Sequence, residues 1–219
     1  ATVMPALRFV EQDHERGAVD DARRQEVIDT VAQIADALPD GTETAESKPA
    51  GSETAERATA APPALRLSLV CLPAVDAADE VAARLLVRAL PPGHYDAVVL
   101  SGSLLKAEML AQAGQAAPDV IVVSAMPPGT LLHARYLCRK LRERHVDVPI
   151  VVALWDAHGD LQKATTRLSA AGECKVVNRV SDALEELDAL RRVRVQGVAI
   201  NGNGNAGAAA REALDASQA

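Results

Sequence analysis

Residues 119–145, DVIVVSAMPPGTLLHARYLCRKLRERH, join a short apolar run to a basic helical segment. Residues 121–123 are continuously apolar but too few for a helix, which predicts a central strand of a parallel sheet. The Pro-Pro-Gly at 127–129 ends this strand, and Thr130 can cap the helix that follows. The free N–H groups of that helix would then face the carboxyl edge of the sheet, where open α/β sheets bind ligands.

The same alternation of apolar strand and amphipathic helix continues on both sides of this stretch. The expected strands are 67–72, 97–100, 120–124, 150–154 and 175–177. The expected helices are 78–89, 104–115, 130–144, 161–171 and 182–190. This pattern predicts an α/β fold with a doubly wound, flavodoxin-like, five-stranded parallel sheet. We expect the strand order 2-1-3-4-5, which places the point of reversal between the first and third strands.

Three further segments flank or interrupt this alternation. Residues 1–38 predict a helical hairpin, with Leu7 and Val10 on one face of the first helix and Asp20 capping the second. Val27, Val31, Ile34 and Leu38 form the expected apolar stripe of the second helix. Residues 39–64 predict a disordered acidic linker, 65–192 the α/β domain and 193–219 a disordered tail. The chain opens inside a helix, which suggests a connection to a longer protein.

Composition and charge limit the classes of function that this chain can have. The 219 residues are 48% hydrophobic, enough for a core, and only 2% aromatic. Residues 1–64 carry 6 basic and 13 acidic side chains, whereas 65–219 carry 17 of each, so the net charge of −7 belongs to the N-terminal part. A balanced domain with few stacking rings gives no reason to expect nucleic-acid binding. No apolar run is long enough for a membrane span, and no signal peptide is recognised.

Reactive and metal-ligating residues form no recognised catalytic set. Cys71, Cys138 and Cys174 lack CxxC spacing, so we expect reduced thiols and neither a disulfide framework nor a zinc site. The first strand ends in Cys71-Leu72-Pro73 and the third in Ser124, where a phosphoacceptor receiver needs a cluster of acids and an Asp. The loop after the first strand contains no glycine, which a dinucleotide fold needs there. Residues 156–160 contain an Asp-x-His-x-Asp, in which capping by Asp160 is a better interpretation than metal binding. We therefore expect a non-enzymatic protein.

The candidate ligand site lies in the loops at the carboxyl edge of the sheet. His133 and Arg135 would lie near a helix N-terminus and could hold a small anionic ligand. The alternative is that His133 packs locally and Arg135 pairs with an acid. Trp155 either forms one wall of a pocket or packs in the core, and Asp79 suits the positive end of its helix. The full candidate set is Asp76, Ser101, Ser124, Met126, Thr130, His133, Arg135 and Trp155.

The block 67–129 resembles the cobalamin-binding domain family. Ser124-Ala125-Met126 stands where that family has Ser-x-Leu after the third strand. The family's Asp-x-His-x-x-Gly motif, whose His ligates cobalt, is replaced by Asp-Ala-Ala-Asp-Glu at 76–80. The Gly-Gly that follows the fourth strand in the family is replaced by Leu-Trp-Asp at 154–156. The resemblance thus implies the fold. We expect no cofactor, and the alternative is a cobalamin bound through a His from elsewhere or without a protein ligand.

A second resemblance covers residues 1–38 and 65–190. MPALRFVEQDHERG, PAVDAADEVAA and SAMPPGTLLHARYLCRKLRERHVDVPIVVALW are similar to the C-terminal extension of some bacterial members of the autoinducer-2 exporter-like permease family. This resemblance implies a regulatory or ligand-sensing domain at the cytoplasmic face of the plasma membrane. The expected partners are a membrane permease portion of the same protein, a small anionic ligand and a second copy of the chain. A cobalamin carrier or sensor, and a structural oligomerisation module, remain alternatives.

Overall fold

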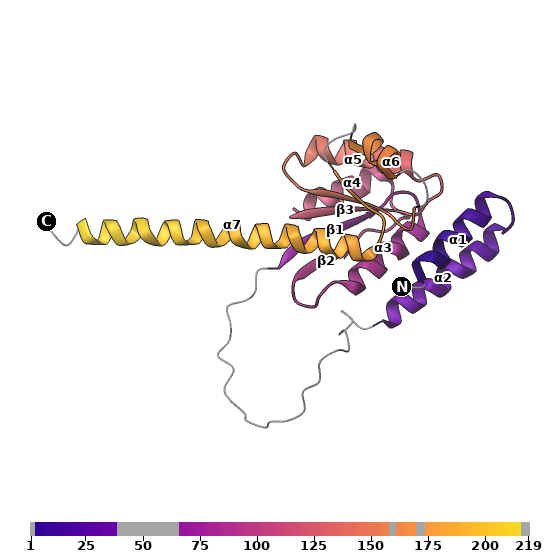
Figure 1. Cartoon of the computed structure of the whole chain (residues 1–219), viewed down its shortest axis with the longest axis horizontal. Coiled ribbons are helices and arrows are strands. Elements are labelled where there is room, and N and C mark those ends of the chain that lie inside the picture. Colours follow the sequence, from indigo (N-terminus) through magenta and orange to yellow (C-terminus); the bar gives the residue numbers. More distant parts are fainter. Residues whose placement is uncertain (1–2, 39–65, 158–160, 170–173, 216–219) are drawn as a thin grey trace, which may run out of the picture. The chain divides into compact units, whose positions relative to one another are not determined.

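The computed structural model describes residues 3–38, 66–157, 161–169 and 174–215, with side chains up to residue 197 (Figure 1). Five strands form one sheet, in which all neighbouring strands are parallel and the order is 2-1-3-4-5. The strands are β1 (Leu67–Pro73), β2 (Tyr95–Val99), β3 (Val120–Ala125), β4 (Ile150–Leu154) and β5 (Lys175–Val177). The predicted fold class and strand order are therefore confirmed.

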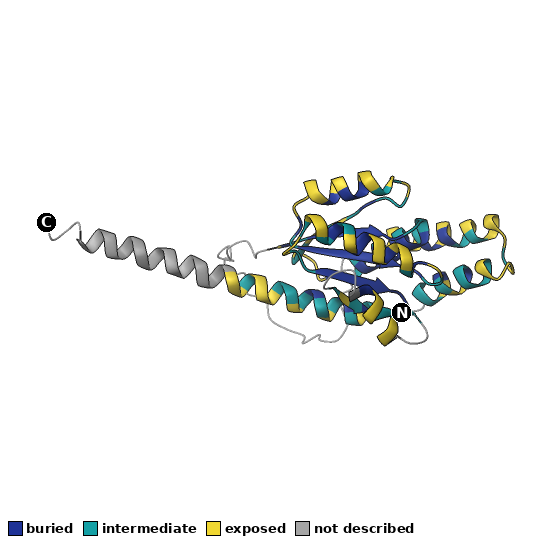
Figure 2. Ribbon diagram, turned by 90° about the horizontal axis from the view of Figure 1, so that it is seen from above, coloured by how far each residue is buried: buried dark blue, intermediate teal, exposed yellow. Residues whose placement is uncertain are grey.

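Burial explains why the central strands could be recognised in the sequence. Every residue of β3 and β4 is buried, whereas the edge strand β2 has no buried residue. Figure 2 shows the dark blue of buried residues in the interior of the sheet. Central strands covered on both faces require continuous apolar runs, while an edge strand tolerates polar positions. β1 pairs with both β2 and β3, so the strand order reverses between β1 and β3 as expected.

Helices cover both faces of the sheet. α4 (Lys106–Gln115), α5 (Leu131–Arg144) and α6 (Leu161–Ser169) bury apolar side chains in one core cluster that also contains Val70 and Leu72 of β1. Leu69 and Cys71 alternate with these residues, so they point to the opposite face, where α3 (Ala77–Ala89) packs. The crossovers thus place α3 on one face and α4 to α6 on the other.

The hairpin consists of α1 (Val3–Glu15) and α2 (Asp21–Ala37). Leu7 and Val10 are buried as predicted, and Asp20 caps α2 by accepting a 2.8 Å hydrogen bond from the Arg23 N–H. The predicted apolar stripe of α2 is partly wrong, because Ile34 is 43% and Leu38 37% exposed. The buried face instead carries Ile28, Val31 and Ala35, at the same helical spacing but rotated around the axis.

The last helix, α7, runs from Val180 to Asp215 and so includes most of the segment 193–219 predicted as a tail. No proline follows Pro149 in the sequence. A helix nucleated at Val180 can therefore extend one residue at a time without a proline to end it. The predicted linker at 39–64 lies outside the described residues. Within the described ranges, no helix combines the length and the apolar character that a membrane crossing requires.

Candidate functional site

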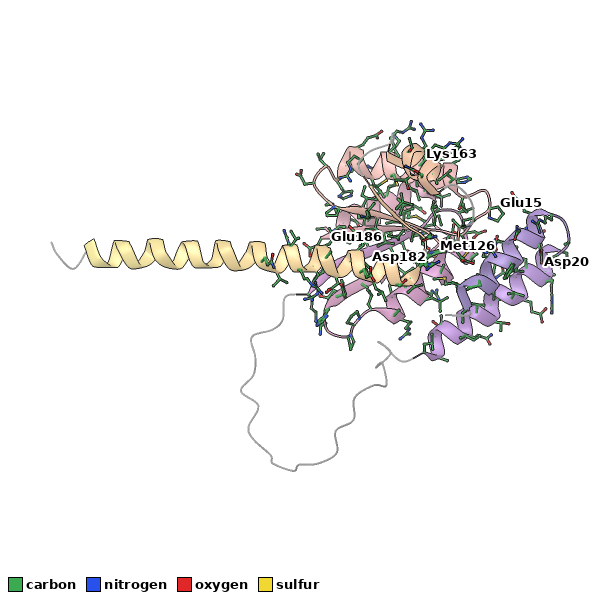
Figure 3. The ribbon with its side chains drawn as sticks, viewed as in Figure 1. Glu15, Asp20, Met126, Lys163, Asp182 and Glu186 are labelled. Carbon is green, nitrogen blue, oxygen red and sulfur yellow. The ribbon has the colours of Figure 1, made fainter. Side chains whose placement is uncertain are left out.

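The loops after β1, β3 and β4 meet at the carboxyl edge of the sheet. The Ala74 N–H donates to the carbonyl of Ser124 at 2.8 Å, which joins the first loop to the end of β3. The Trp155 N–H donates to the carbonyl of Ala125 at 3.0 Å, which joins the fourth loop to the same strand. Met126, labelled in Figure 3, follows directly after β3. The structure therefore brings together three of the candidate residues, namely Ser124, Met126 and Trp155.

A buried hydrogen-bonded chain links these loops through side chains. The indole N–H of Trp155 donates to Ser124 Oγ at 2.7 Å, and this hydroxyl donates to the Asp79 carbonyl at 2.7 Å. The Asp79 carboxylate accepts from the Met126 N–H at 2.5 Å and from the Val75 N–H at 2.7 Å. Because its hydroxyl both donates and accepts here, Ser124 acts as a structural link between β3 and the helix α3.

Asp79 is the centre of this network, and it is only 1% exposed. Burial raises the pKa of its carboxyl to about 7, against the opposing effect of the backbone N–H groups of Met126 and Val75. The nearby carboxylate of Asp76 raises this pKa further. Asp79 was not among the predicted site residues. The sequence could have indicated its burial, because Asp79 lies one turn before the apolar Ala83 and two turns before Leu86, on the buried face of α3.

Asp76 connects this edge to the hairpin. Its carboxylate caps α3 by accepting from the Ala78 N–H at 3.0 Å, as its position at the positive end of that helix predicts. The second carboxylate oxygen accepts from the guanidinium of Arg24 in α2. Arg24 also binds both carboxylate oxygens of Glu11 in α1, at 2.8 and 3.0 Å. Arg24 therefore joins both hairpin helices to the first loop of the sheet.

A second ion pair joins the hairpin to the fourth loop. Nε of Arg8 in α1 donates to the carboxylate of Asp156 at 2.8 Å, and the side chains are 12% and 34% exposed. Asp156 follows Trp155 and has a φ of +49°, a conformation that Asp tolerates better than most residues. This pairing accounts for Asp156, while His158 and Asp160 lie outside the described residues. Among the described side chains no group of three or more could hold a metal ion.

The loop after β2 closes against the loop after β1. Glu80 accepts hydrogen bonds from the Gly102 N–H at 2.8 Å and from Ser101 Oγ at 3.2 Å, so the candidate Ser101 is bound to α3. A Cβ on Gly102 would lie 2.7 Å from the backbone oxygen of Asp76, which shows how closely the two loops approach. Lys106 donates to the carbonyl of Val75 at 3.4 Å, and burial lowers the pKa of its ammonium group.

The remaining candidates lie at and beyond the start of α5. Thr130 is 8% exposed and precedes the helix, but its hydroxyl makes no capping hydrogen bond, so the predicted cap is wrong. Its φ and ψ are already helical, which turns the side chain away from the usual capping position. His133 and Arg135 are exposed on either side of the buried face that contains Leu137. The candidate set therefore divides into buried residues, partly exposed residues and an exposed pair of basic side chains, which are respectively Ser124, Met126, Thr130 and Trp155, then Asp76 and Ser101, then His133 and Arg135.

No protein-family model matches the chain, and no curated protein matches it either.

Proposed function

We propose that this chain is a non-enzymatic regulatory or ligand-sensing domain of a membrane transporter related to the autoinducer-2 exporter-like permeases. The observation that carries the proposal is the attachment of the hairpin to the carboxyl edge of the sheet. Arg24 pairs with Asp76 after β1, and Arg8 pairs with Asp156 after β4. The hairpin is thus held by charged groups at the place where this fold class takes its ligands.

The strength of these ion pairs favours a reversible attachment. The acids are 37% and 34% exposed, so solvent and salt screen both pairs. Ion pairs of this kind contribute about 0–1 kcal/mol each. A ligand phosphate or carboxylate could replace the protein carboxylates, because a guanidinium binds such groups through two parallel hydrogen bonds.

Regulation would then follow from a difference in ligand affinity between two arrangements of the hairpin. A ligand that binds Arg8 and Arg24 only when their acids are displaced favours the released arrangement. The shift in the equilibrium cannot exceed this difference in binding free energy, and values of about 1–3 kcal/mol are usual for such coupling. The permease portion of the same protein would respond to the position of the hairpin, at the cytoplasmic face of the membrane.

A thermal-shift experiment on the full chain tests the proposal. The probes are inorganic phosphate, nucleoside phosphates, cyclic dinucleotides and cobalamins. A ligand at 100 times its dissociation constant should stabilise the folded chain by about 2.7 kcal/mol. We expect a phosphate-bearing probe to give this shift, and we expect Arg24→Gln and Arg8→Gln to abolish it.

Arg66→Gln is the matched control, because Arg66 pairs with Asp96 at the opposite end of the sheet from the candidate site. This variant should keep the full thermal shift. A probe that binds Arg24→Gln and Arg8→Gln as well as the unmodified chain would contradict the hairpin mechanism. If binding is instead lost in His133→Ala and Arg135→Ala, the exposed pair on α5 is the ligand site. A shift with cobalamin alone would support the carrier alternative.

The exposed apolar residues of the hairpin favour one second candidate, a structural oligomerisation module. Phe9 is 54% exposed, and Ile34 on α2 and Leu38 directly after it are also exposed. A second copy could cover these side chains. Light scattering over a range of concentrations, on the full chain and on Phe9→Ser, distinguishes the candidates. A dimer that dissociates in Phe9→Ser, together with no ligand-induced shift, would favour the oligomerisation module.

A further inference from the structure

The outer surface of α5 and α6 is strongly basic. These two helices lie next to each other on one face of the sheet (Figure 1). Together they carry seven lysines and arginines and one acid, Glu143. The helices α1, α2 and α3, by contrast, carry five basic and nine acidic side chains. Positive charge is therefore concentrated on the α5–α6 surface, although residues 65–219 as a whole are balanced.

Exposed apolar side chains lie among the basic ones on the outer face of α5. Leu132 is 72% and Tyr136 is 42% exposed, and they are one turn apart on the helix. Arg139 follows on the same side, with its guanidinium carbon 6.0 Å from the centre of the Tyr136 ring. Arg135 and Arg144 are also exposed. The α5–α6 surface therefore offers apolar side chains between positive charges.

The one acid of this surface is neutralised by its neighbours. Glu143 accepts a hydrogen bond from the ammonium group of Lys140 at 2.7 Å. This hydrogen bond, together with the charges of Arg139 and Arg144, lowers the pKa of Glu143. α6 adds two basic side chains and no acidic one. The electrostatic potential over both helices is thus positive.

We propose that the α5–α6 surface docks on a membrane that contains anionic phospholipids. Each Lys or Arg held near such a membrane strengthens binding by about 5-fold. Exposed Leu and Tyr side chains suit the boundary between headgroups and acyl chains, where an apolar body and a polar tip are both accommodated. The division of charge also orients the domain, because the same lipids repel the acidic helices α1 to α3.

Two other occupants fit this surface less well. The acidic hairpin of a second copy has much of its charge already paired, because Glu11, Glu26 and Asp36 each bind an arginine of their own copy. Single-stranded nucleic acid is held by stacking its bases on several aromatic rings. α5 and α6 contain one aromatic side chain, that of Tyr136. A lipid surface requires only the charges and the apolar side chains that are present.

Sedimentation of the full chain with unilamellar vesicles tests the proposal. The vesicles contain either phosphatidylcholine alone or an equal mixture of phosphatidylcholine and phosphatidylglycerol. We expect binding to the mixed vesicles only, and weaker binding at high salt because salt screens the charges. Arg139→Gln combined with Arg144→Gln should weaken this binding by about 30-fold. Leu132→Ser should weaken it by about 10-fold. All three residues are exposed, so these variants should fold.

The hairpin provides matched controls. Arg16→Gln combined with Arg23→Gln removes the same number of charges from exposed positions and should keep full binding. Ile34→Ser removes another exposed apolar side chain and should also keep it. Equal binding to the two kinds of vesicle, no binding to the mixed vesicles, or an equal loss in the controls would overturn the proposal.

Further measurements on the same variants identify a different occupant. Tighter binding to an oligonucleotide than to the mixed vesicles at the same salt would assign the surface to nucleic acid and overturn the proposal. Self-association in light scattering that disappears in Arg139→Gln with Arg144→Gln would assign it to a second copy, with the same consequence.

The lipid surface does not depend on the regulatory mechanism, because none of its residues belongs to the ion pairs that hold the hairpin. The two proposals can therefore fail separately. Vesicle binding without any ligand-induced thermal shift would support the lipid surface and contradict the ligand-sensing function. A thermal shift without vesicle binding would have the opposite meaning.

Discussion

Asp79→Asn should change how the stability of the chain depends on pH. The carboxyl has a pKa of about 7 in the folded protein and an ordinary value of 3.8. Between these values the folded chain holds a proton that the unfolded chain has released. The free energy of unfolding therefore includes a contribution that is fully present below pH 3.8 and is lost as the pH rises through 7.

The size of this effect follows from the two pKa values. Each pH unit changes the free energy of unfolding by about 1.4 kcal/mol while the folded and unfolded states differ by one proton. Over the roughly three units between the two values the loss is on the order of 4 kcal/mol, of which about 3 kcal/mol falls between pH 5 and 7. Because Asp79 is 1% exposed, solvent screening removes little of this effect. The charged groups that act on it are Asp76 and Lys106.

Urea unfolding between pH 5 and pH 8 measures the effect. Trp155 is the only Trp in the chain and belongs to the Asp79 network, so its fluorescence reports on this region. Asp79→Asn loses one acceptor of a backbone N–H, which costs about 1–3 kcal/mol at every pH. It should also lack the slope between pH 5 and 7 that the unmodified chain shows. Equal slopes in the two proteins would refute the reasoning and would mean that the N–H groups of Val75 and Met126 keep the carboxylate ionised.

Two further effects on stability are expected, each measured by denaturant unfolding. Gly102→Ala should destabilise the fold by about 1–3 kcal/mol, because the new Cβ would meet the backbone of Asp76. Gly114→Ala is its control and should stabilise the chain by about 0.5–1 kcal/mol, since it lies in α4 with its nearest neighbours 3.9 Å away. Trp155→Phe should lower the free energy of unfolding by about 1–3 kcal/mol, because it removes the hydrogen bond from the indole N–H to Ser124 Oγ. In a chain that already carries Ser124→Ala, the same substitution should not have this cost.

The sheet could be predicted well from the sequence, because its central strands are buried on both faces and are therefore apolar throughout. β4 and β5 begin and end at the predicted residues, and β3 differs by one residue at its end. Strands buried on both faces must be apolar throughout, so neighbouring polar residues mark their limits. The buried face of the hairpin was harder to predict, because α2 contains two overlapping apolar stripes. Only packing against α1 and α3 decides that Ile28 is buried and Ile34 exposed.

The candidate site was harder to predict, because its main interactions join distant parts of the chain. Arg24 and Asp76 are 52 residues apart, and Arg8 and Asp156 are 148 apart. No local pattern distinguishes such an arginine from a solvated one. Asp79 was interpreted from its helical position alone, which explains a charge at the helix start but does not reveal burial. Ser124, Met126 and Trp155 could be placed together, because each follows or ends a strand at the same edge of the sheet.

The carboxyl edge contains two sets of interactions, an inner layer of buried hydrogen bonds around Asp79 and an outer layer of ion pairs to the hairpin. Breaking the two layers costs different free energies. Opening the buried layer would leave the Asp79 carboxyl and the Trp155 N–H without partners, at about 1–3 kcal/mol for each neutral group and more for a charge. Releasing the hairpin breaks three partly exposed ion pairs, Arg8–Asp156, Arg24–Asp76 and Arg84–Asp36, at about 0–1 kcal/mol each, and it also separates the apolar side chains that pack between the hairpin and α3. A ligand whose affinities for two states differ by about 1–3 kcal/mol can therefore compete with the ion pairs of the outer layer but cannot open the inner one. A response to a ligand at this edge should thus appear as movement of the hairpin, while the environment of Trp155 stays unchanged.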